Sequence, residues 1–182
     1  MVLFINACVR ENSRTLVLAK DFLNRCCGDI VELNLEKESI LPLNRELLSK
    51  RENLIAKEAF NDEMFKYARQ FADADEIVIA APFWDLGFPA LFKIYIEAIT
   101  VSGITFRYNE GRPQGFCKAK KLTYITTAGG PIHDDFGYTY IKTLARNFYG
   151  ISNVECIRAE NLDVECVAPE DVLHKCKITT IK

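Results

Sequence analysis

The sequence predicts an α/β fold, a doubly wound sheet of five parallel strands with helices on both faces. Two observations predict it. Short apolar runs of strand length alternate along the 182 residues with longer stretches whose apolar residues recur at helical spacing. The runs Val2 to Ala7 and Ile77 to Ala81 are apolar almost throughout, which is typical of parallel strands buried on both faces. No repeat, low-complexity tract or linker breaks the alternation, so we expect one domain over residues 1–182.

In the first half of the chain, the pattern predicts the first two strands, each followed by a helix. We expect strands at Val2 to Ala7 and Ile30 to Leu35, and helices at Arg14 to Cys27 and Phe60 to Ala72. Between the second strand and the second helix, Glu36 to Arg51 is expected to be a long polar connection with some local helix. Leu18, Phe22 and Cys26 share one face of the first helix, and Gly28 is placed to end it.

The second half continues the alternation. We expect strands at Ile77 to Ala81, Lys121 to Thr127 and Val154 to Ala159, and helices at Phe88 to Ile99 and Tyr140 to Tyr149. A hairpin-like excursion is expected at Ile104 to Cys117, between the first of these helices and the strand that starts at Lys121. Phe88, Leu91, Phe92 and Tyr95 follow the i, i+3, i+4, i+7 spacing of a helix with one apolar face. Pro169 stands where the first turn of a terminal helix would begin.

Composition excludes several classes of function. A formal net charge of −2 gives no electrostatic basis for binding nucleic acid or an anionic membrane surface. No apolar run is long enough to span a membrane, and the chain starts directly with a strand rather than a secretion signal, so we expect a cytoplasmic protein. The seven cysteines are scattered and never spaced Cys-x-x-Cys, which favours reduced thiols over disulfides or a zinc site.

The loop after the third strand displays large aromatic residues. Residues 82–89 read Pro-Phe-Trp-Asp-Leu-Gly-Phe-Pro, and they follow a strand whose carboxyl end lies where open α/β sheets place their ligands. A flat aromatic ligand would explain why Phe83 and Trp84 stand there. The alternative is that both rings only cap the core.

The loop after the first strand suits a phosphate. Cys8 to Thr15 combines Ser13 and Thr15 hydroxyls with the free N–H groups of a helix start, and Arg10 or Arg14 could add a charge-assisted contact. The alternative is an ordinary helix cap by Asn12 or Ser13. Neither a Gly-x-Gly-x-x-Gly motif nor a Walker lysine motif is present, so the dinucleotide and nucleoside-triphosphate fingerprints are absent.

The loop after the fourth strand is rich in glycine. In Thr126-Thr-Ala-Gly-Gly-Pro-Ile-His133, paired glycines let backbone amides approach a ligand closely, and threonine hydroxyls can bond the polar edge of a ring. The alternative is a tight turn that needs positive φ. In a parallel sheet all three loops lie along one edge, and a phosphate site beside an aromatic slot describes a mononucleotide. Flavin mononucleotide (FMN) fits best, in the usual ligand position of a flavodoxin-like sheet.

Three segments carry a resemblance to a known family. Ile77-Val-Ile-Ala-Ala-Pro82, Gly103-Ile-Thr-Phe-Arg-Tyr108 followed by Gly111 and Gly115, and Lys120-Lys-Leu-Thr-Tyr-Ile-Thr-Thr-Ala-Gly-Gly130 resemble the FMN-dependent NADH:quinone reductase/azoreductase family. The resemblance is strongest from about residue 75 to 165, and its Thr-Phe-Arg-Tyr block is the most specific part. It implies a flavodoxin-like homodimer that binds FMN at its interface. It also implies that NADH or NADPH reduces quinones or azo compounds by two electrons in a ping-pong cycle.

The resemblance also implies roles for single residues. Ser13, Arg14 and Thr15 would hold the FMN phosphate, with Cys8 and Arg10 beside them. The isoalloxazine ring would lie against Pro82, Phe83, Trp84, Asp85 and Leu86, and its polar edge against Thr127, Ala128, Gly129 and Gly130. His133 and Tyr108 would be the catalytic or substrate-side residues.

The chain departs from the family pattern at single positions. Asp85 stands where the family often has Asn, and an ionised carboxylate cannot donate to the flavin, so Asp85 must be protonated, use its backbone amide or point away. Cys8 occupies a position usually held by Ser. A non-enzymatic electron carrier or a redox-sensing FMN-binding protein is the alternative function. A metal site at His133-Asp-Asp135 is not expected, because three consecutive residues do not easily converge on one ion.

Overall fold

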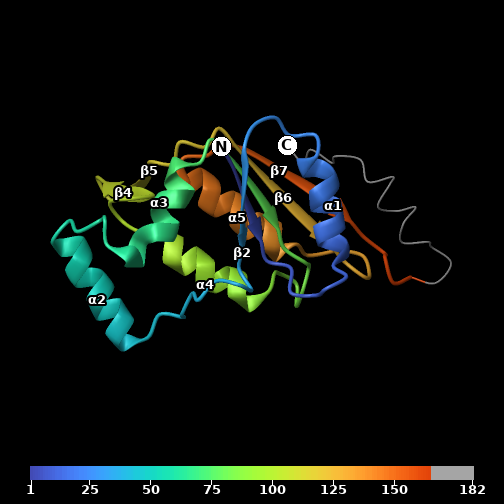
Figure 1. Cartoon of the computed structure of the whole chain (residues 1–182), viewed down its shortest axis with the longest axis horizontal. Coiled ribbons are helices and arrows are strands. Elements are labelled where there is room, and N and C mark those ends of the chain that lie inside the picture. The colour runs from blue at the N-terminus through green and yellow to red at the C-terminus, as the bar shows by residue number, and fades with distance from the viewer. Residues whose placement is uncertain (165–182) are drawn as a thin grey trace.

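The computed structural model describes residues 1–164, and its centre is one parallel sheet with the strand order β2-β1-β3-β6-β7 (Figure 1). Its strands are β1 (Val2–Asn6), β2 (Ile30–Asn34), β3 (Glu76–Ala80), β6 (Lys121–Thr127) and β7 (Asn153–Ala159). Each neighbouring pair is parallel. This is the flavodoxin-like order, in which the ligand position lies between β1 and β3. The predicted fold class is confirmed.

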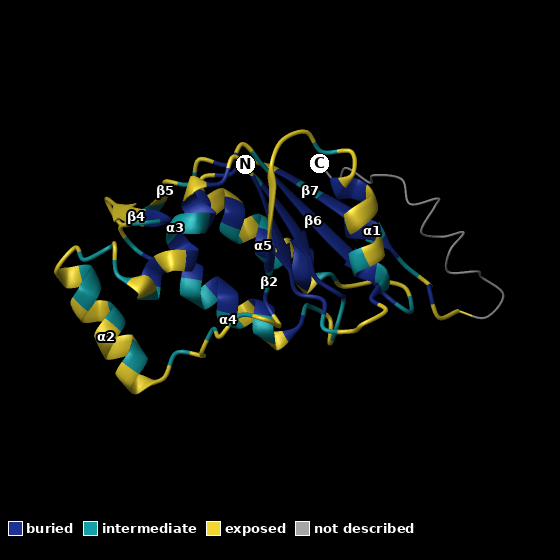
Figure 2. Cartoon of the chain, viewed as in Figure 1, coloured by how far each residue is buried: buried dark blue, intermediate teal, exposed yellow. Residues whose placement is uncertain are grey.

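Helices cover both faces of the sheet. They are α1 (Arg14–Leu23), α2 (Arg45–Ala56), the short 3₁₀ turn η1 (Glu63–Phe65), α3 (Lys66–Asp73), α4 (Ala90–Ile99), α5 (Phe136–Leu144) and the π-helical turn η2 (Ala145–Tyr149). Phe71, Tyr95 and Tyr138 bring α3, α4 and α5 into one apolar core, while Leu18 and Phe22 of α1 pack in the core on the opposite face. Figure 2 shows the central strands buried between these two layers.

A small antiparallel hairpin, β4 (Phe106–Asn109) with β5 (Arg112–Gly115), follows α4. It lies at the amino-terminal edge of the sheet. After the hairpin, the N–H of Lys118 donates to the carbonyl of Ala72 near the end of α3, and the N–H of Lys120 donates to Asp75, directly before β3. The hairpin is therefore at the end of the sheet opposite to the loops that leave β1, β3 and β6.

Several helices differ in their bounds from the sequence prediction; α5, for example, begins at Phe136 rather than Tyr140. α1 ends at Leu23 rather than Cys27, because Asn24 already forms its C-cap and Gly28 turns the chain four residues later with φ +104°. Helix α2 begins inside the segment Glu36 to Arg51, which was expected to be mainly a connection, and continues to Ala56; Asn44 caps it by accepting from the N–H of Leu47 at 2.8 Å. No residue of α2 is buried, so its sequence lacks the apolar stripe by which helices are recognised (Figure 2). The predicted helix after Pro169 lies outside the described residues.

Candidate functional site

Four loops meet at the carboxyl edge of the sheet and enclose a cavity of about 180 Å³. They follow β1, β3, β6 and β7. The cavity is lined by Arg10, Asn12, Ser13, Arg14, Thr15, Pro82, Phe83, Trp84, Thr127, Ala128, Gly129 and Asp163. The structure thus brings together residues from all three predicted loops. It adds a fourth loop, after β7, which the sequence analysis did not consider.

The start of α1 forms one end of this cavity. The Ser13 hydroxyl accepts from the N–H of Leu16 at 3.3 Å and caps the helix, as the structural alternative expected. Within residues 1–164, the N–H groups of Arg14 and Thr15 donate no backbone hydrogen bond. Unpaired N–H groups at a helix start, together with the helix dipole, attract an anion. Capping by Ser13 and anion binding by the following N–H groups are therefore compatible.

The hydroxyls of Thr15 and Thr127 are bonded to each other rather than free. Their oxygens lie 2.6 Å apart and both residues are buried, so the bond joins the start of α1 to the end of β6. Thr15 was predicted to hold a phosphate through its hydroxyl. The structure instead leaves it the backbone N–H for that purpose.

Arg14 is also already engaged. One terminal nitrogen donates to the Leu162 carbonyl at 2.7 Å and the other to the Asp163 carboxylate at 2.6 Å. These two contacts tie the start of α1 to the loop after β7. Two terminal N–H groups and the Nε–H of Arg14 are left for a ligand, because a guanidinium carries five donors.

Phe83 and Trp84 form the aromatic wall of the cavity. Both rings are half-buried and line the cavity, so they do more than cap the core. The N–H of Phe83 donates to the Thr127 carbonyl at 3.1 Å, which fixes this loop to the end of β6. The guanidinium of Arg10 lies 5.6 Å from the centre of the Trp84 ring, within cation–π range, and links the first loop to the aromatic one.

The chain next to this wall makes a strained tight turn. Trp84 and Gly87 exchange two backbone hydrogen bonds, at 2.8 and 3.3 Å, around Asp85 and Leu86. Both central residues have positive φ, +50° and +63°, a conformation that favours Gly and Asn and that leucine rarely adopts. Asp85 is exposed on this turn and lies outside the cavity lining. Of the three options for Asp85, the structure favours a side chain that points away.

The two glycines after β6 differ in what they contact. Neither has positive φ, so the alternative of a turn that requires it is wrong. A Cβ on Gly129 would lie 2.1 Å from a carboxylate oxygen of Asp163, whereas one on Gly130 would meet nothing within 4 Å. A side chain at Gly129 would therefore displace the Asp163 carboxylate from its present position. Only Gly129 of the pair lines the cavity.

Several predicted site residues do not line the cavity. Cys8 is 5% exposed, its thiol lies 3.7 Å from the Ala80 carbonyl, and its side chain is absent from the cavity lining. Burial raises the pKa of this thiol to about 11. Leu86 is exposed on the strained turn, and His133 is exposed on the loop before α5. Tyr108 is 61% exposed on the β4–β5 hairpin, at the opposite edge of the sheet.

The described residues provide neither a metal site nor a membrane span. Within residues 1–164, no three metal-ligating side chains converge. In the same part of the chain, no helix has the length and apolar character that crossing a membrane requires.

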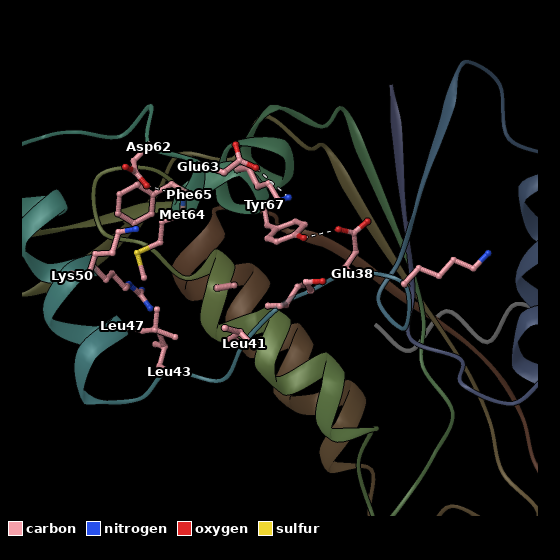
Figure 3. A pocket seen from close by; sticks show the side chains of 16 residues that line it. Glu38, Leu41, Leu43, Leu47, Lys50, Asp62, Glu63, Met64, Phe65 and Tyr67 are labelled. Atoms are coloured by element: carbon pink, nitrogen blue, oxygen red, sulfur yellow. Dashed lines mark hydrogen bonds and ion pairs between the residues drawn. The ribbon is translucent and has the colours of Figure 1, made fainter.

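A larger hollow of about 460 Å³ lies beside α2 and is lined in part by the segment that follows β2. Figure 3 shows Leu43 and Leu47 on its α2 side and Met64 and Tyr67 on its η1–α3 side. The Tyr67 hydroxyl donates to Glu38 at 2.6 Å and holds the segment before α2 in place. In a flavodoxin-like sheet the ligand binds at the carboxyl edge between β1 and β3, so we assign ligand binding to the smaller cavity, which the loops after these two strands line.

Known proteins resemble the whole chain. A family model described as a flavodoxin-like fold matches residues 1–178. An FMN-dependent NADH:quinone oxidoreductase from Clostridium perfringens is 38% identical over 184 residues, covering 96% of this chain and 92% of the relative. The chain belongs to this family. A second FMN-dependent NADH:quinone oxidoreductase, from Caldicellulosiruptor bescii, is 36% identical and covers 100% of this chain and 94% of its own length.

Solved structures of azoreductases share the fold of this family member. The azoreductase from Bacillus anthracis strain Sterne superposes with a TM-score of 0.82 at 25% identity, covering 95% of this chain and 92% of the other. An FMN-dependent NADH-azoreductase from Bacillus anthracis strain Ames Ancestor, solved in complex with FMN, gives a TM-score of 0.80 at 24% identity, with 95% and 92% coverage. At 24% identity, the similarity to this second structure shows a shared fold.

Proposed function

We propose that this protein is an FMN-dependent oxidoreductase that oxidises NADH or NADPH and reduces quinones or azo compounds by two electrons. One observation carries the proposal. A single cavity at the ligand edge of a flavodoxin-like sheet combines unpaired N–H groups at the start of α1 with the half-buried rings of Phe83 and Trp84. A phosphate at one end and a flat ring system at the other is the outline of FMN. The names of the curated relatives support the same cofactor and activity.

The residues of the cavity fit the two ends of FMN. The phosphate would lie at the N–H groups of Arg14 and Thr15, with the guanidiniums of Arg10 and Arg14 near it. The ring would lie against Phe83 and Trp84. The backbone from Thr127 to Gly129 would face the ring's polar edge. The N–H of Ala128 already donates to the Ala159 carbonyl, so the N–H of Gly129 is the donor that would stabilise negative charge there.

The cavity holds only part of such a ligand. Its volume of about 180 Å³ is below the ~300–1,000 Å³ usual for drug-sized ligands, so the ring would extend over the turn of Asp85 and Leu86 and towards His133. Bound FMN would supply the hydride-accepting and electron-transferring chemistry. In the ping-pong order we propose, the nicotinamide leaves before the acceptor enters the same place. His133 would orient that acceptor.

We infer that the active form is a homodimer. Tyr108 stands on the hairpin at the amino edge, so within one chain it cannot contact a ligand at the carboxyl edge. A second copy could bring its own Tyr108 over the exposed outer side of the ring. We also propose a cytoplasmic location, which agrees with the free thiols of Cys8, Cys26, Cys27, Cys117 and Cys156.

Flavin content and kinetics test the function. We expect purified protein to bind FMN and to oxidise NADH or NADPH faster when a naphthoquinone is added. Double-reciprocal plots at several quinone concentrations should be parallel, as a ping-pong cycle requires. Protein that binds FMN but leaves pyridine nucleotides unoxidised would instead be an electron carrier. Protein that takes up no FMN would disprove the proposal.

Mixing two inactive variants tests the dimer. Tyr108→Ala removes the residue that would act across the interface, and Trp84→Ala damages the ring wall of the same chain. If Tyr108 acts from the second copy, co-expressed chains should regain activity in mixed dimers, each of which has one intact site. No recovery in mixed dimers would place the role of Tyr108 elsewhere.

A further inference from the structure

The loop after β7 brings an acid into the proposed FMN site. Asp163 lines the same cavity as Ser13, Arg14 and Gly129. Its carboxylate pairs with the Arg14 guanidinium at 2.6 Å. Arg14 is 31% exposed and Asp163 is 64% exposed, so the pair lies at the rim of the anion end.

The backbone holds this loop firmly against the glycine loop. The N–H of Asp163 donates to the Gly129 carbonyl at 2.9 Å, and the N–H of Leu162 donates to the Ala128 carbonyl at 3.2 Å. The carboxylate rests over Gly129, where a Cβ would leave it no room. The backbone of Asp163 is therefore attached to the loop that would face the polar edge of the flavin.

Arg14 in turn is held at two points. The Leu162 carbonyl and the Asp163 carboxylate accept from different terminal nitrogens of the guanidinium, which removes most of the rotation of this long side chain. Preorganisation of this kind reduces the entropy that binding would otherwise cost. The donors that remain are three of the five of a guanidinium, enough for a bidentate contact with a phosphate.

We propose that Asp163 is a positioning residue that orients Arg14 for the phosphate of FMN. The inference rests on the proposed function. A carboxylate could instead compete with the phosphate for Arg14. Competition would require the Asp163 carboxylate to release Arg14 when the ligand enters. A held Arg14 can contact the phosphate through its free donors without breaking the pair.

Comparing FMN with riboflavin isolates the phosphate, because the two ligands differ only there. We expect Asp163→Ala to weaken FMN binding about five- to tenfold, which is the size of one ordinary hydrogen bond, because Arg14 keeps its charge and loses only its orientation. Riboflavin affinity should stay within about twofold. Asp163→Asn keeps an acceptor and should recover part of the loss. In an Arg14→Met background, Asp163→Ala should have no further effect on FMN. Both affinities can be measured by fluorescence titration of the apoprotein.

A matched control is Asp134→Ala, which removes an exposed carboxylate on the loop before α5 and should leave the ratio of FMN to riboflavin affinity unchanged. Tighter FMN binding by Asp163→Ala would mean competition and overturn the inference. An equal loss for both ligands would mean that Asp163 only supports the loop, which also overturns it. Wild-type protein that binds neither ligand would refute the proposed function itself, and the inference with it.

Discussion

At the scale of single residues, three glycines show how the neighbouring atom decides the cost of a side chain. A Cβ on Gly129 would meet the carboxylate end of Asp163 at 2.1 Å, and that side chain can rotate away. A Cβ on Gly115 would meet the backbone of Tyr149 at 2.1 Å and of Gly150 at 2.2 Å, which cannot. A Cβ on Gly130 would meet nothing within 4 Å. Replacing glycine by alanine therefore has a different stability cost at each of these three positions.

We predict that alanine at these positions lowers the free energy of unfolding least at Gly130, more at Gly129 and most at Gly115. Gly129→Ala should cost at most about 1 kcal/mol, since it breaks an exposed ion pair. Gly115→Ala should cost about 3 kcal/mol or more, because backbone must move. Urea denaturation of the apoproteins measures these costs. A Gly129→Ala variant as unstable as Gly115→Ala would contradict our description of the Asp163 contact.

At the scale of elements, the turn from Trp84 to Gly87 has a strained backbone and lies directly beside the aromatic wall of the cavity. Asp85 and Leu86 both have positive φ, and the N–H of Phe136 at the start of α5 donates to the Leu86 carbonyl at 3.2 Å. Gly137 packs against the same turn, since a Cβ there would lie 3.2 Å from the Gly87 carbonyl. The turn is thus held by α5 in a conformation that its sequence does not favour. Such strain persists where the surrounding structure enforces it.

We predict that Leu86→Gly stabilises the apoprotein by about 0.5–1 kcal/mol, because relief of the left-handed strain outweighs the added freedom of the unfolded chain. It should also weaken FMN binding, because the turn that follows Trp84 becomes less rigid. Glu58→Gly is the matched control, an exposed residue with φ +52° that does not line the cavity. It should be stabilising without changing FMN affinity. Thermal unfolding and FMN titration of both variants check this, and equal effects of the two on FMN affinity would argue against a role for the turn.

At the scale of the whole molecule, sequence patterns predicted the sheet better than the details of the site. Period and length revealed all five parallel strands, and the rule that ligands bind at carboxyl ends located three loops of the cavity. The same rule applied to β7 would have found Asp163. The extent of helix α2 was underestimated because it buries no residue, and the pairing of Thr15 with Thr127 joins residues far apart in the chain. Contacts of that kind depend on packing, which periodicity does not report.

The buried thiols make the stability of the folded chain depend on pH in the alkaline range. Burial raises the pKa of Cys8 to about 11 and those of Cys117 and Cys156 to about 12, from an ordinary 9.0. Above pH 9 the unfolded chain releases these protons while the folded chain keeps them. The stability that the thiols contribute is therefore complete below pH 9 and is lost as the pH rises towards 11 or 12.

We predict that the free energy of unfolding falls between pH 8 and pH 10, by about 1 kcal/mol for each buried thiol at pH 10. Cys156→Ala removes the fully buried thiol and should make this fall smaller by about that amount, whatever it does to stability at pH 8. Cys27→Ala, at an exposed position, should keep the wild-type fall. Urea denaturation of the apoproteins at both pH values measures the difference. An unchanged fall in Cys156→Ala would mean that this thiol ionises equally well in the folded and unfolded chains.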